Sequence, residues 1–541
     1  MKKLASLFVL SALATLAQAQ TPATVTFDVM EFVVEGNTVL PPEQVERVVS
    51  PFMGPGKTFK DMEAARTALE KAYQDAGYLS VVVNLPDQRV DSGEVKLEVV
   101  QASVDRLKVT GAQYHRPSLI ADKTPALAGG QVPYFPEVQE QLATVQGQDV
   151  EVTPLIGPGQ DPRQIDVELK VKDSLPVHGS LEANSRQNFN TTQGRTEAVL
   201  TYGNLFQRDH TIGLSWIYAP ARPADANTLA ALYSMPLSTV DTLSAYFARS
   251  NTDTPTKSGL GGSTFTRGRY GGLVYHHDLQ ARQWPVTHGF DLGLDFKRSS
   301  DRNIDIGGVT TEKPSLHYEV LSARYNLSWR GENDNVTNWR AGLYSSFRSI
   351  SERQVDCNGV RLDQFACKRS GASADFSVFK LGMGRVQNLP ASWQMKFDVD
   401  ARLASGPLVP AEKYSLGGID TIRGYYDYEQ SADQGWNTRL ELISPAWLKF
   451  KDDEGVRALL FWDRGELRLI KPLPSEIHKV QMGSYGLGLR LNNSKGLTAR
   501  VDLAFPIYDT SKPTESGGQE AASGSQAARR WRVDAALRQS F

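Results

Sequence analysis

The stretch WQMKFDVDARL, residues 393–403, alternates apolar and polar side chains without interruption. In an extended strand its apolar residues fall on one face, and its four charged residues fall on the other. Those four are Lys396, Asp398, Asp400 and Arg402. A soluble β-sandwich would not place four charges on its inner face, whereas a barrel with lipid outside and water inside would. The stretch therefore predicts a strand of a membrane β-barrel.

The same alternation continues from about Val177 to Phe541, and it is clear again at 485–491 and 497–505. We count about sixteen such segments, separated by connections that are alternately short and long. Short periplasmic turns and long external loops are typical of outer-membrane barrels. We therefore predict a membrane all-β fold, a 16-stranded antiparallel outer-membrane β-barrel, over residues 175–541.

The first residues have the pattern of a secretory signal peptide. Two lysines precede an apolar run, Leu4 to Leu16, and Ala17-Gln18-Ala19 follows it as a small-x-small cleavage site. The run is too short to span ~30 Å of hydrocarbon as an anchor. We predict cleavage after residue 19. No later apolar stretch reaches the ~18–20 residues of a membrane helix, so a membrane protein of this sequence has to be a barrel.

Between this leader and the barrel, the outline of one small α/β domain occurs twice. FVVEG at 32–36 matches LKVTG at 107–111, and the alternation of 95–99 returns at 165–171. Two helical segments lie between these strands in each copy. We predict two tandem domains with the order β-α-α-β-β, at residues 27–101 and 102–174.

One connection, EKYSLGGIDTIRGY at 412–425, is too polar and too rich in glycine for a membrane-facing strand. Glycine pairs allow positive φ and a close approach to another surface. We expect the segment 405–435 to fold back into the barrel, where Arg423 holds it. A buried guanidinium needs an anionic partner. Asp463 is the best candidate, although it could instead begin an external turn and leave Arg423 solvated.

Other features limit the function. Cys357 and Cys367 lie close together in one polar loop, where an oxidising compartment favours a disulfide over two free thiols. The net charge of −2, without a basic tract interleaved with aromatic residues, gives no reason to expect nucleic acid. The usual hydrolase, metalloprotease and phosphate-binding motifs are absent. His276 and His277 would point to opposite faces of a strand, so we expect them not to share a metal ion. From the missing motifs we expect no enzyme, and we expect no metal and no cofactor.

Two motifs resemble those of a known family. Gly417-Gly418 with Ile422-Arg423-Gly424-Tyr425, followed by Phe461-x-Asp463-x-Gly465, is similar to the paired signature of two-partner secretion outer-membrane transporters. These are the haemolysin secretion/activation proteins of the ShlB/FhaC/HecB type, in the superfamily that includes BamA. The resemblance covers essentially the whole mature chain. It implies that the two repeats are POTRA domains and that Arg423 bonds Asp463.

The terminal Phe541 resembles the recognition signal by which the barrel-assembly machinery assembles bacterial outer-membrane proteins in general. The chain departs from the family near its start. Members often carry a plug helix and a linker before the first POTRA domain, and residues 20–29 are too few for both. We therefore expect the segment 405–435, alone or together with some of the outer loops, to block the pore in place of a helix.

The resemblance implies a pore that exports an unfolded partner protein, a β-helical adhesin or cytolysin, with its POTRA domains in the periplasm. Strand addition to the sheet edges would capture the client. Further expected partners are periplasmic chaperones and outer-membrane lipid. An insertase of the BamA type is the nearest alternative, and more repeats would favour it. A passive porin is a second alternative, for which the α/β repeats would have no use.

Overall fold

The computed structural model describes residues 25–90, 92–161, 163–188, 191–251, 256–257, 264–265, 267–279, 285–299, 302–304, 310–312, 314–357, 359–447, 455–474, 476–508, 510 and 531–541. The predicted signal peptide, 1–19, lies outside these residues. The chain forms two compact units that meet between Leu175 and Pro176. No helix among the described residues is both long and apolar enough to cross a membrane.

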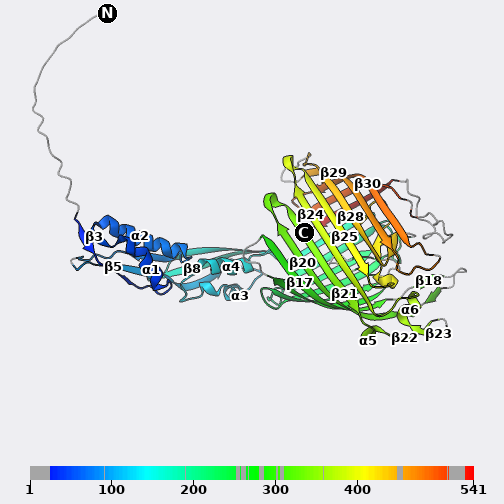
Figure 1. The fold of residues 1–541 in the computed structure, drawn as a ribbon, viewed down its shortest axis with the longest axis horizontal. Helices are drawn as coiled ribbons and strands as arrows, with labels where there is room; N and C mark the ends of the chain where they lie inside the picture. The colour runs from blue at the N-terminus through cyan, green and yellow to red at the C-terminus, as the bar shows by residue number, and fades with distance from the viewer. Residues whose placement is uncertain are drawn as a thin grey trace, which may run out of the picture. The chain divides into compact units, whose positions relative to one another are not determined.

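The second unit is a closed barrel of sixteen antiparallel strands, which confirms the predicted fold class (Figure 1). Each strand pairs with its neighbour in sequence, and the last strand pairs with the first to close the wall. In chain order the strands are β9 (Val177–Asn184), β10 (Arg195–Leu205), β11 (His210–Tyr218), β12 (Asn227–Pro236), β13 (Asp241–Ser250), β16 (Gly268–Leu279), β17 (Val286–Ser299), β20 (Leu316–Arg330), β21 (Val336–Ser346), β24 (Phe376–Asn388), β25 (Gln394–Ala404), β28 (Gln434–Ile443), β29 (Gly455–Arg468), β30 (Lys479–Asn492), β31 (Leu497–Pro506) and β32 (Arg532–Ser540).

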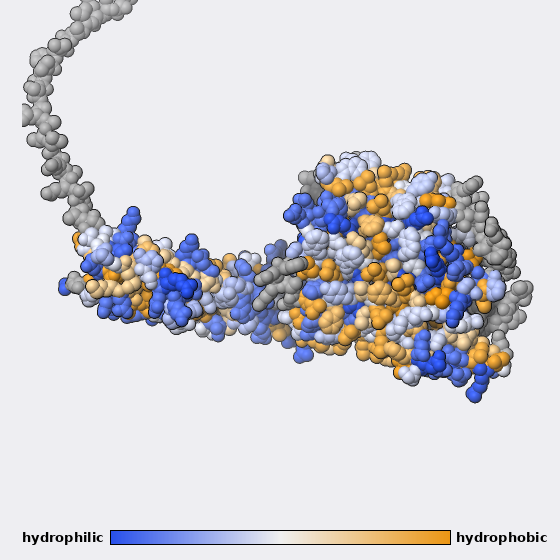
Figure 2. All heavy atoms as spheres, viewed as in Figure 1, coloured by the Kyte–Doolittle hydropathy of each residue, from blue (hydrophilic) through white to orange (hydrophobic). Residues whose placement is uncertain are grey.

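Alternate residues of each strand face opposite sides of this wall. On β29, Leu460 and Trp462 are exposed on the outer surface, whereas Phe461 and Asp463, which alternate with them, are buried inside. Apolar residues are correspondingly spread over the outer wall (Figure 2). An apolar outside with charges inside is the arrangement that lipid around an aqueous lumen requires.

The two ends of the barrel differ. At one end the connections are short, as between Leu205 and His210 or between Pro236 and Asp241. We call this the short-turn end, and the chain enters the barrel there at Val177. The opposite, long-loop end carries short strand pairs and helices within its connections: β14 (Thr256–Lys257) with β15 (Thr264–Phe265), β18 (Arg302–Ile304) with β19 (Thr310–Glu312), and the elements between β21 and β24.

The first unit holds two small α/β domains. In the first are β1 (Phe27–Val29), β2 (Glu31–Glu35), α1 (Pro42–Val49), η1 (Ser50–Phe52), β3 (Gly54–Lys57), α2 (Phe59–Asp75), β4 (Val81–Asn84) and β5 (Glu94–Gln101). Its main sheet has the order β2-β5-β4, and β1 pairs separately with β3. The predicted order β-α-α-β-β therefore omits β1 and β3. The sequence Gly-Pro-Gly-Lys of β3 has no apolar alternation, so only its pairing makes it a strand.

The second domain follows the predicted order. It consists of β6 (Ser103–Thr110), α3 (Pro117–Asp122), η2 (Pro125–Leu127), α4 (Phe135–Val145), β7 (Val150–Pro158) and β8 (Gln164–Asp173). Its sheet has the order β6-β8-β7, which matches β2-β5-β4, with a parallel first pair and an antiparallel second pair in both. Two copies of one topology account for the repeat in the sequence.

Two equivalent glycines end the first strand of each main sheet. Gly36 has φ +86° and Gly111 has φ +82°. A Cβ on Gly36 would lie 2.4 Å from the carbonyl oxygen of Val99, and one on Gly111 would lie 2.3 Å from that of Val171. Only glycine fits this turn, because L side chains are disfavoured at positive φ and the neighbouring strand leaves no room.

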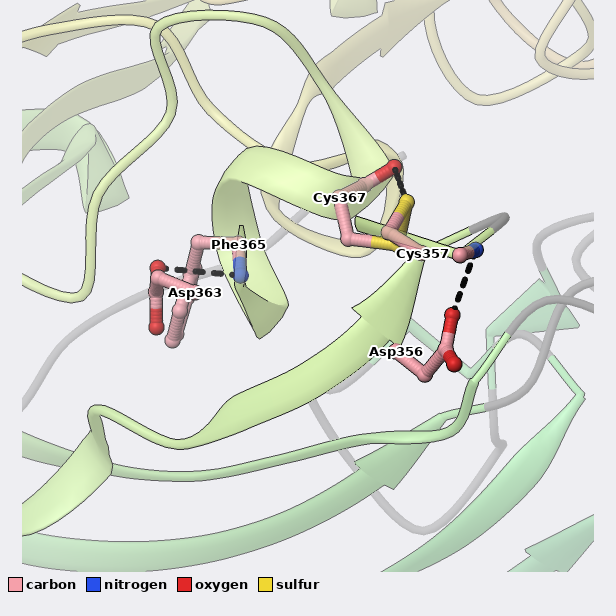
Figure 3. The surroundings of a disulfide bond; sticks show 6 residues. Asp356, Cys357, Asp363, Phe365 and Cys367 are labelled. Carbon is pink, nitrogen blue, oxygen red and sulfur yellow. Dashed lines mark hydrogen bonds between the residues drawn. A yellow bond between two sulfur atoms is a disulfide. The ribbon is translucent and has the colours of Figure 1, made fainter. Parts of the chain in front are cut away.

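The two cysteines form a disulfide in the long connection between β21 and β24 (Figure 3). This connection contains α5 (Arg348–Ser351), β22 (Gln354–Cys357), β23 (Val360–Asp363) and α6 (Gln364–Lys368). We call it the disulfide cap (347–375). The Oδ2 atom of Asp363 accepts a hydrogen bond of 3.1 Å from the backbone N–H of Phe365 at the start of α6.

The disulfide cap packs onto the barrel through a small apolar core. Phe365 is fully buried against Tyr318 of β20 and Phe376 of β24. Leu408 and Val409, which follow β25, belong to the same core. The cap therefore shares its packing with the beginning of the segment that the sequence predicts to enter the barrel.

We predict that Gly111→Ala lowers the free energy of unfolding of the second α/β domain by roughly 2 kcal/mol or more, because it combines a left-handed conformation with a backbone collision. Hydrogen–deuterium exchange of the full-length protein in detergent should then show faster exchange in β8. The control is Gly147→Ala, where a Cβ meets nothing within 4 Å. Equal exchange in both variants would contradict the assignment.

We also predict that Cys357→Ser with Cys367→Ser loosens the disulfide cap without unfolding the barrel. A cross-link across so short a loop contributes about 3 kcal/mol at most, and the barrel hydrogen bonds remain. Trypsin should cut the cap of the variant faster, while the heat-modifiable gel shift of the folded barrel stays. Reduction of the native protein should give the same pattern. Equal cleavage rates for all three samples would show that the disulfide does not restrain the cap.

Candidate functional site

The connection between β25 and β28 is a hairpin that turns into the lumen. It contains η5 (Pro410–Glu412), β26 (Tyr414–Leu416) and β27 (Gln430–Ala432), and β26 pairs with β27 in antiparallel register. Because β28 begins at Gln434, this connection spans residues 405–433, and we call it the inserted loop. Its tip, residues 417–429, contacts inward-facing residues of the wall.

Two glycines shape the start of the tip. Gly417 and Gly418 have φ of +113° and +90°. A Cβ on Gly418 would lie 1.9 Å from Oδ1 of Asp427, on the returning limb. The backbone N–H of Gly417 donates to the hydroxyl of Thr421 at 2.9 Å. The glycine pair thus brings the two limbs closer together than any side chain would allow.

Arg423 lies at the centre of the site, with a side chain that is 1 % exposed. Its Nε and Nη2 atoms donate to the two carboxylate oxygens of Asp463 at 2.8 and 2.7 Å, and its backbone N–H donates to Oδ2 at 3.1 Å. Nη1 donates to Oε1 of Glu441 at 2.7 Å. Two carboxylates therefore surround one guanidinium, and the bidentate pair is the strongest geometry available to it.

The wall presents these partners because of strand alternation. Phe461, Asp463 and Gly465 of β29 share the inner face, as the spacing Phe-x-Asp-x-Gly requires. The guanidinium carbon of Arg423 lies 3.6 Å from the ring centroid of Phe461, so that a cation–π contact supports it from one side. A Cβ on Gly465 would lie 2.6 Å from Cδ1 of Leu416, so the missing side chain makes room for β26 against the wall.

Other residues of the first motif pack the tip of the loop against apolar side chains. Ile422 and Tyr425 are buried in one cluster with Leu416 of β26 and Met482 of β30. The Tyr425 hydroxyl lies 3.0 Å from the carbonyl oxygen of Gly483 and 2.9 Å from that of Tyr508. Gly424, with φ +88°, lets the backbone pass β31 between these anchors.

Three further polar contacts hold the loop, and the sequence prediction did not include them. At the start of the loop, Glu412 accepts hydrogen bonds of 2.7 Å from Nζ of Lys297 and from the hydroxyl of Tyr318. At its end, Asp433 accepts from Arg369 of the disulfide cap and, at 2.6 Å, from the backbone N–H of Ile470. The loop is therefore fastened at its base as well as at its tip.

The third contact joins the tip to the segment that follows β9. Nη2 of Arg186 donates to Asp420 at 2.6 Å. The backbone N–H of Asp427 donates to the carbonyl oxygen of Gln187 at 2.9 Å, and the backbone N–H of Gln187 donates to Oδ2 of Asp427 at 3.1 Å. The tip is thus held both at β28–β29 and beside the first strand of the barrel.

The predicted site residues fall into three places. The structure brings Arg423, Asp463 and the seven residues of the two motifs together at the tip of the inserted loop. Cys357 and Cys367 lie apart, in the disulfide cap. Phe541 lies at the short-turn end, where its backbone exchanges two hydrogen bonds of 3.0 Å with Gly179 and the residue is 69 % exposed.

Glu441 was missed, although one signal pointed to it. It alternates with Leu440 and Leu442 in β28, so a carboxylate on the lumenal face was readable from the pattern. The partners Lys297, Arg369 and Arg186 carried no such signal, because their pairing depends on the path of the loop. Among the described residues, no group of three or more His, Cys, Asp or Glu side chains could hold a metal ion.

Two family models match parts of this chain. A family model described as POTRA domain, ShlB-type, matches residues 27–102. A second one, haemolysin secretion/activation protein ShlB/FhaC/HecB, matches residues 358–491, which include the disulfide cap's cysteine Cys367, the inserted loop and β29. Both halves of the described site, Arg423 and Asp463, fall within the second match.

Individual relatives have low sequence identity to this chain, but the matches cover most of both proteins. The heme/hemopexin transporter protein HuxB of Haemophilus influenzae is 18 % identical over 477 residues, 86 % of this chain and 80 % of that protein. The outer membrane transporter CdiB of Escherichia coli is 23 % identical over 522 residues, with 89 % and 80 % covered.

Solved structures show the same fold. CdiB from Escherichia coli superposes with a TM-score of 0.61 at 17 % identity, over 98 % of this chain and 93 % of that one. BamA from Haemophilus ducreyi lacking POTRA domains 1–3 gives 0.53 at 12 % identity, over 96 % and 100 %. The matched POTRA and ShlB/FhaC/HecB models, together with the two motifs assembled in the lumen, show that the chain carries the domains of haemolysin secretion/activation proteins of the ShlB/FhaC/HecB type.

Proposed function

We propose that the chain is an outer-membrane pore that exports a secreted partner protein, and that the inserted loop closes the lumen in the resting state. The observation that carries this proposal is the buried guanidinium of Arg423, held by Asp463 and Glu441 on the inner wall. A loop fastened inside the lumen lies in the path of a polypeptide, so export requires it to move. The short-turn end faces the periplasm and the long-loop end faces the cell exterior.

The POTRA domains receive the client in the periplasm. Each main sheet has two open edges, β2 and β4 in the first domain and β6 and β7 in the second. An extended client segment can pair with such an edge through backbone hydrogen bonds, whatever its sequence. The client is an unfolded β-helical adhesin or cytolysin, as the family resemblance implies. Its folding outside the cell supplies the direction of transport, because the sequence carries no nucleotide-binding motif.

Several accessory roles complete the proposal. Periplasmic chaperones keep the barrel precursor unfolded, and the barrel-assembly machinery inserts it after binding the terminal Phe541. The protein acts without a cofactor, without nucleic acid and without enzymatic chemistry. The relatives support export in general terms, since HuxB and CdiB are both named as transporters.

The two rival functions fit less well. Insertion of other barrels is the function of BamA-type proteins, and the likeness to BamA is a likeness of fold. Two POTRA domains, rather than a longer series, favour secretion. A passive porin would leave the POTRA domains without a role and would not need a loop fastened across its lumen.

We predict that Arg423→Ala reduces secretion of the partner to background while the barrel still assembles. The change leaves the buried Asp463 carboxylate without its cation, whereas Glu441 keeps Arg439 at 3.5 Å, and breaking a buried ion pair costs roughly 3–5 kcal/mol. Secretion is measured by immunoblotting of the medium, and assembly by the heat-modifiable gel shift. Arg340→Ala is the matched control, because Arg340 pairs with Asp400 inside the barrel and does not touch the loop. Normal secretion by Arg423→Ala would reject the proposed role.

The pair itself is tested by exchanging its charges. Arg423→Asp and Asp463→Arg each bring like charges together, whereas the double variant restores one opposite pair. A double-mutant cycle should give a coupling energy of about 1–3 kcal/mol from the opening equilibrium of the pore. Single-channel conductance in planar bilayers gives that equilibrium. Additive effects of the two changes would mean that Arg423 and Asp463 act independently.

Gly418→Ala should displace the loop without removing any charge. Its Cβ would overlap the Asp427 carboxylate, and the left-handed conformation adds strain of roughly 1–3 kcal/mol. We expect a higher open probability than for the native pore. Gly406→Ala, in the same loop but with nothing within 4 Å of its Cβ, should leave conductance unchanged. If the two variants conduct alike, the glycine pair does not hold the loop in place.

A further inference from the structure

Four basic or titratable side chains form one row across the outer wall, near the long-loop end. Strand register pairs Arg249 of β13 with Arg269 of β16, Arg269 with Arg298 of β17, and Arg298 with His317 of β20. The three arginines are exposed. On each strand they share the face of apolar residues that point outward, such as Phe247, two positions before Arg249.

This row borders an apolar surface. Phe247 and Phe296 lie two positions from Arg249 and Arg298 along their strands, toward the middle of the wall. Leu273 and Leu321 lie still closer to the middle, and all four side chains are exposed. Arg269, Arg298, Phe247 and Phe296 line one hollow of about 350 Å³. The same surface therefore offers cations at the level of lipid headgroups and an apolar floor at the level of acyl chains.

The disulfide cap extends the cationic part. Arg353 reaches over the rim into the same hollow, with Nη1 3.4 Å from Nδ1 of His317. One carboxylate, Glu319, also lines the hollow, and it accepts from the Ser351 hydroxyl at 3.2 Å and lies 3.9 Å from Arg353. Among the described residues that line this hollow there are thus three arginines, Arg269, Arg298 and Arg353, and a single carboxylate.

Such a row is unfavourable without an anion. Like charges directly opposite each other on neighbouring strands destabilise a sheet. Within the part of the chain that the structure describes, no carboxylate forms an ion pair with Arg249, Arg269 or Arg298. Arginine is the side chain best suited to bind phosphate in a bidentate manner. The arrangement therefore calls for a ligand that carries several phosphates.

We propose that this row is a binding site for a phosphorylated lipid of the outer leaflet, with its phosphates on Arg249, Arg269, Arg298 and Arg353 and its acyl chains on the apolar surface below. The site faces away from the lumen, so a client in transit does not meet it. Basic clusters at a membrane surface bind anionic headgroups, and the neighbouring Phe and Leu side chains suit acyl chains. Lipid held against both the wall and Arg353 also joins the disulfide cap to the membrane.

Native mass spectrometry of the full-length protein in detergent tests this site, with bis-phosphorylated lipid A as the probe. The triple variant Arg249→Gln, Arg269→Gln, Arg298→Gln should bind it at least about ten-fold more weakly than the native protein, because each lost cation removes a charge-assisted contact. Arg330→Gln, which removes an exposed cation from the opposite end of β20, is the matched control and should bind as the native protein does. Folding of every variant is verified by the heat-modifiable gel shift.

Two further probes separate the possible sources of phosphate. Dephosphorylated lipid A should bind weakly to all variants, and inorganic phosphate at millimolar concentration should not displace the lipid. Equal binding of both lipids, equal binding by the native and triple-variant proteins, or full displacement by inorganic phosphate would each overturn the proposal. A triple variant that binds lipid normally but secretes poorly would assign the row to the client protein instead.

Discussion

A guanidinium buried inside a barrel has to be neutralised where it lies, and the inserted loop depends on this constraint. Removing an unpaired charge from water is costly, so Arg423 is stable in the lumen only against Asp463 and Glu441. The partners in turn require β28 and β29 to hold their register, which places both acids on the inner face as diagonal neighbours, with Asp463 opposite Arg439 and Glu441 opposite Phe461. The glycines bring the backbone close enough for the contact. The position of the loop therefore depends on the carboxylates of the wall, and the buried carboxylates depend on the guanidinium of the loop.

The charged side chains inside the wall and those outside it have different surroundings. Inside, acids and bases of the wall and the loop neutralise each other, as Glu412 does with Lys297. Outside, basic side chains lie at the rim, where water and headgroups are within reach, and the middle of the wall stays apolar. The disulfide cap touches both regions, because Arg369 contacts the inserted loop and Arg353 lies at the outer rim.

The alternation of residues 393–403 was sufficient to predict the barrel, because a period of two on a lipid-facing strand is directly visible in sequence. The Phe-x-Asp-x-Gly spacing places Asp463 on the same face as Phe461, whereas its pairing with Arg423 was implied by the family resemblance. Contacts that depend on the path of a loop were not predictable, and Arg369 with Asp433 is the clearest case, since 64 residues separate them. The strand β3 was missed for a related reason, because pairing with β1 alone defines it.

The pairing of β26 with β27 limits how the lumen can open. A hairpin whose two limbs are joined by backbone hydrogen bonds cannot be drawn out as a single thread without losing that ladder. It can instead pivot as one stiff arm about its two ends, where Glu412 and Asp433 are anchored. In such a movement the tip of the inserted loop is displaced over a long distance while its base stays attached to the wall. The loop can then return to its original position after each transport event.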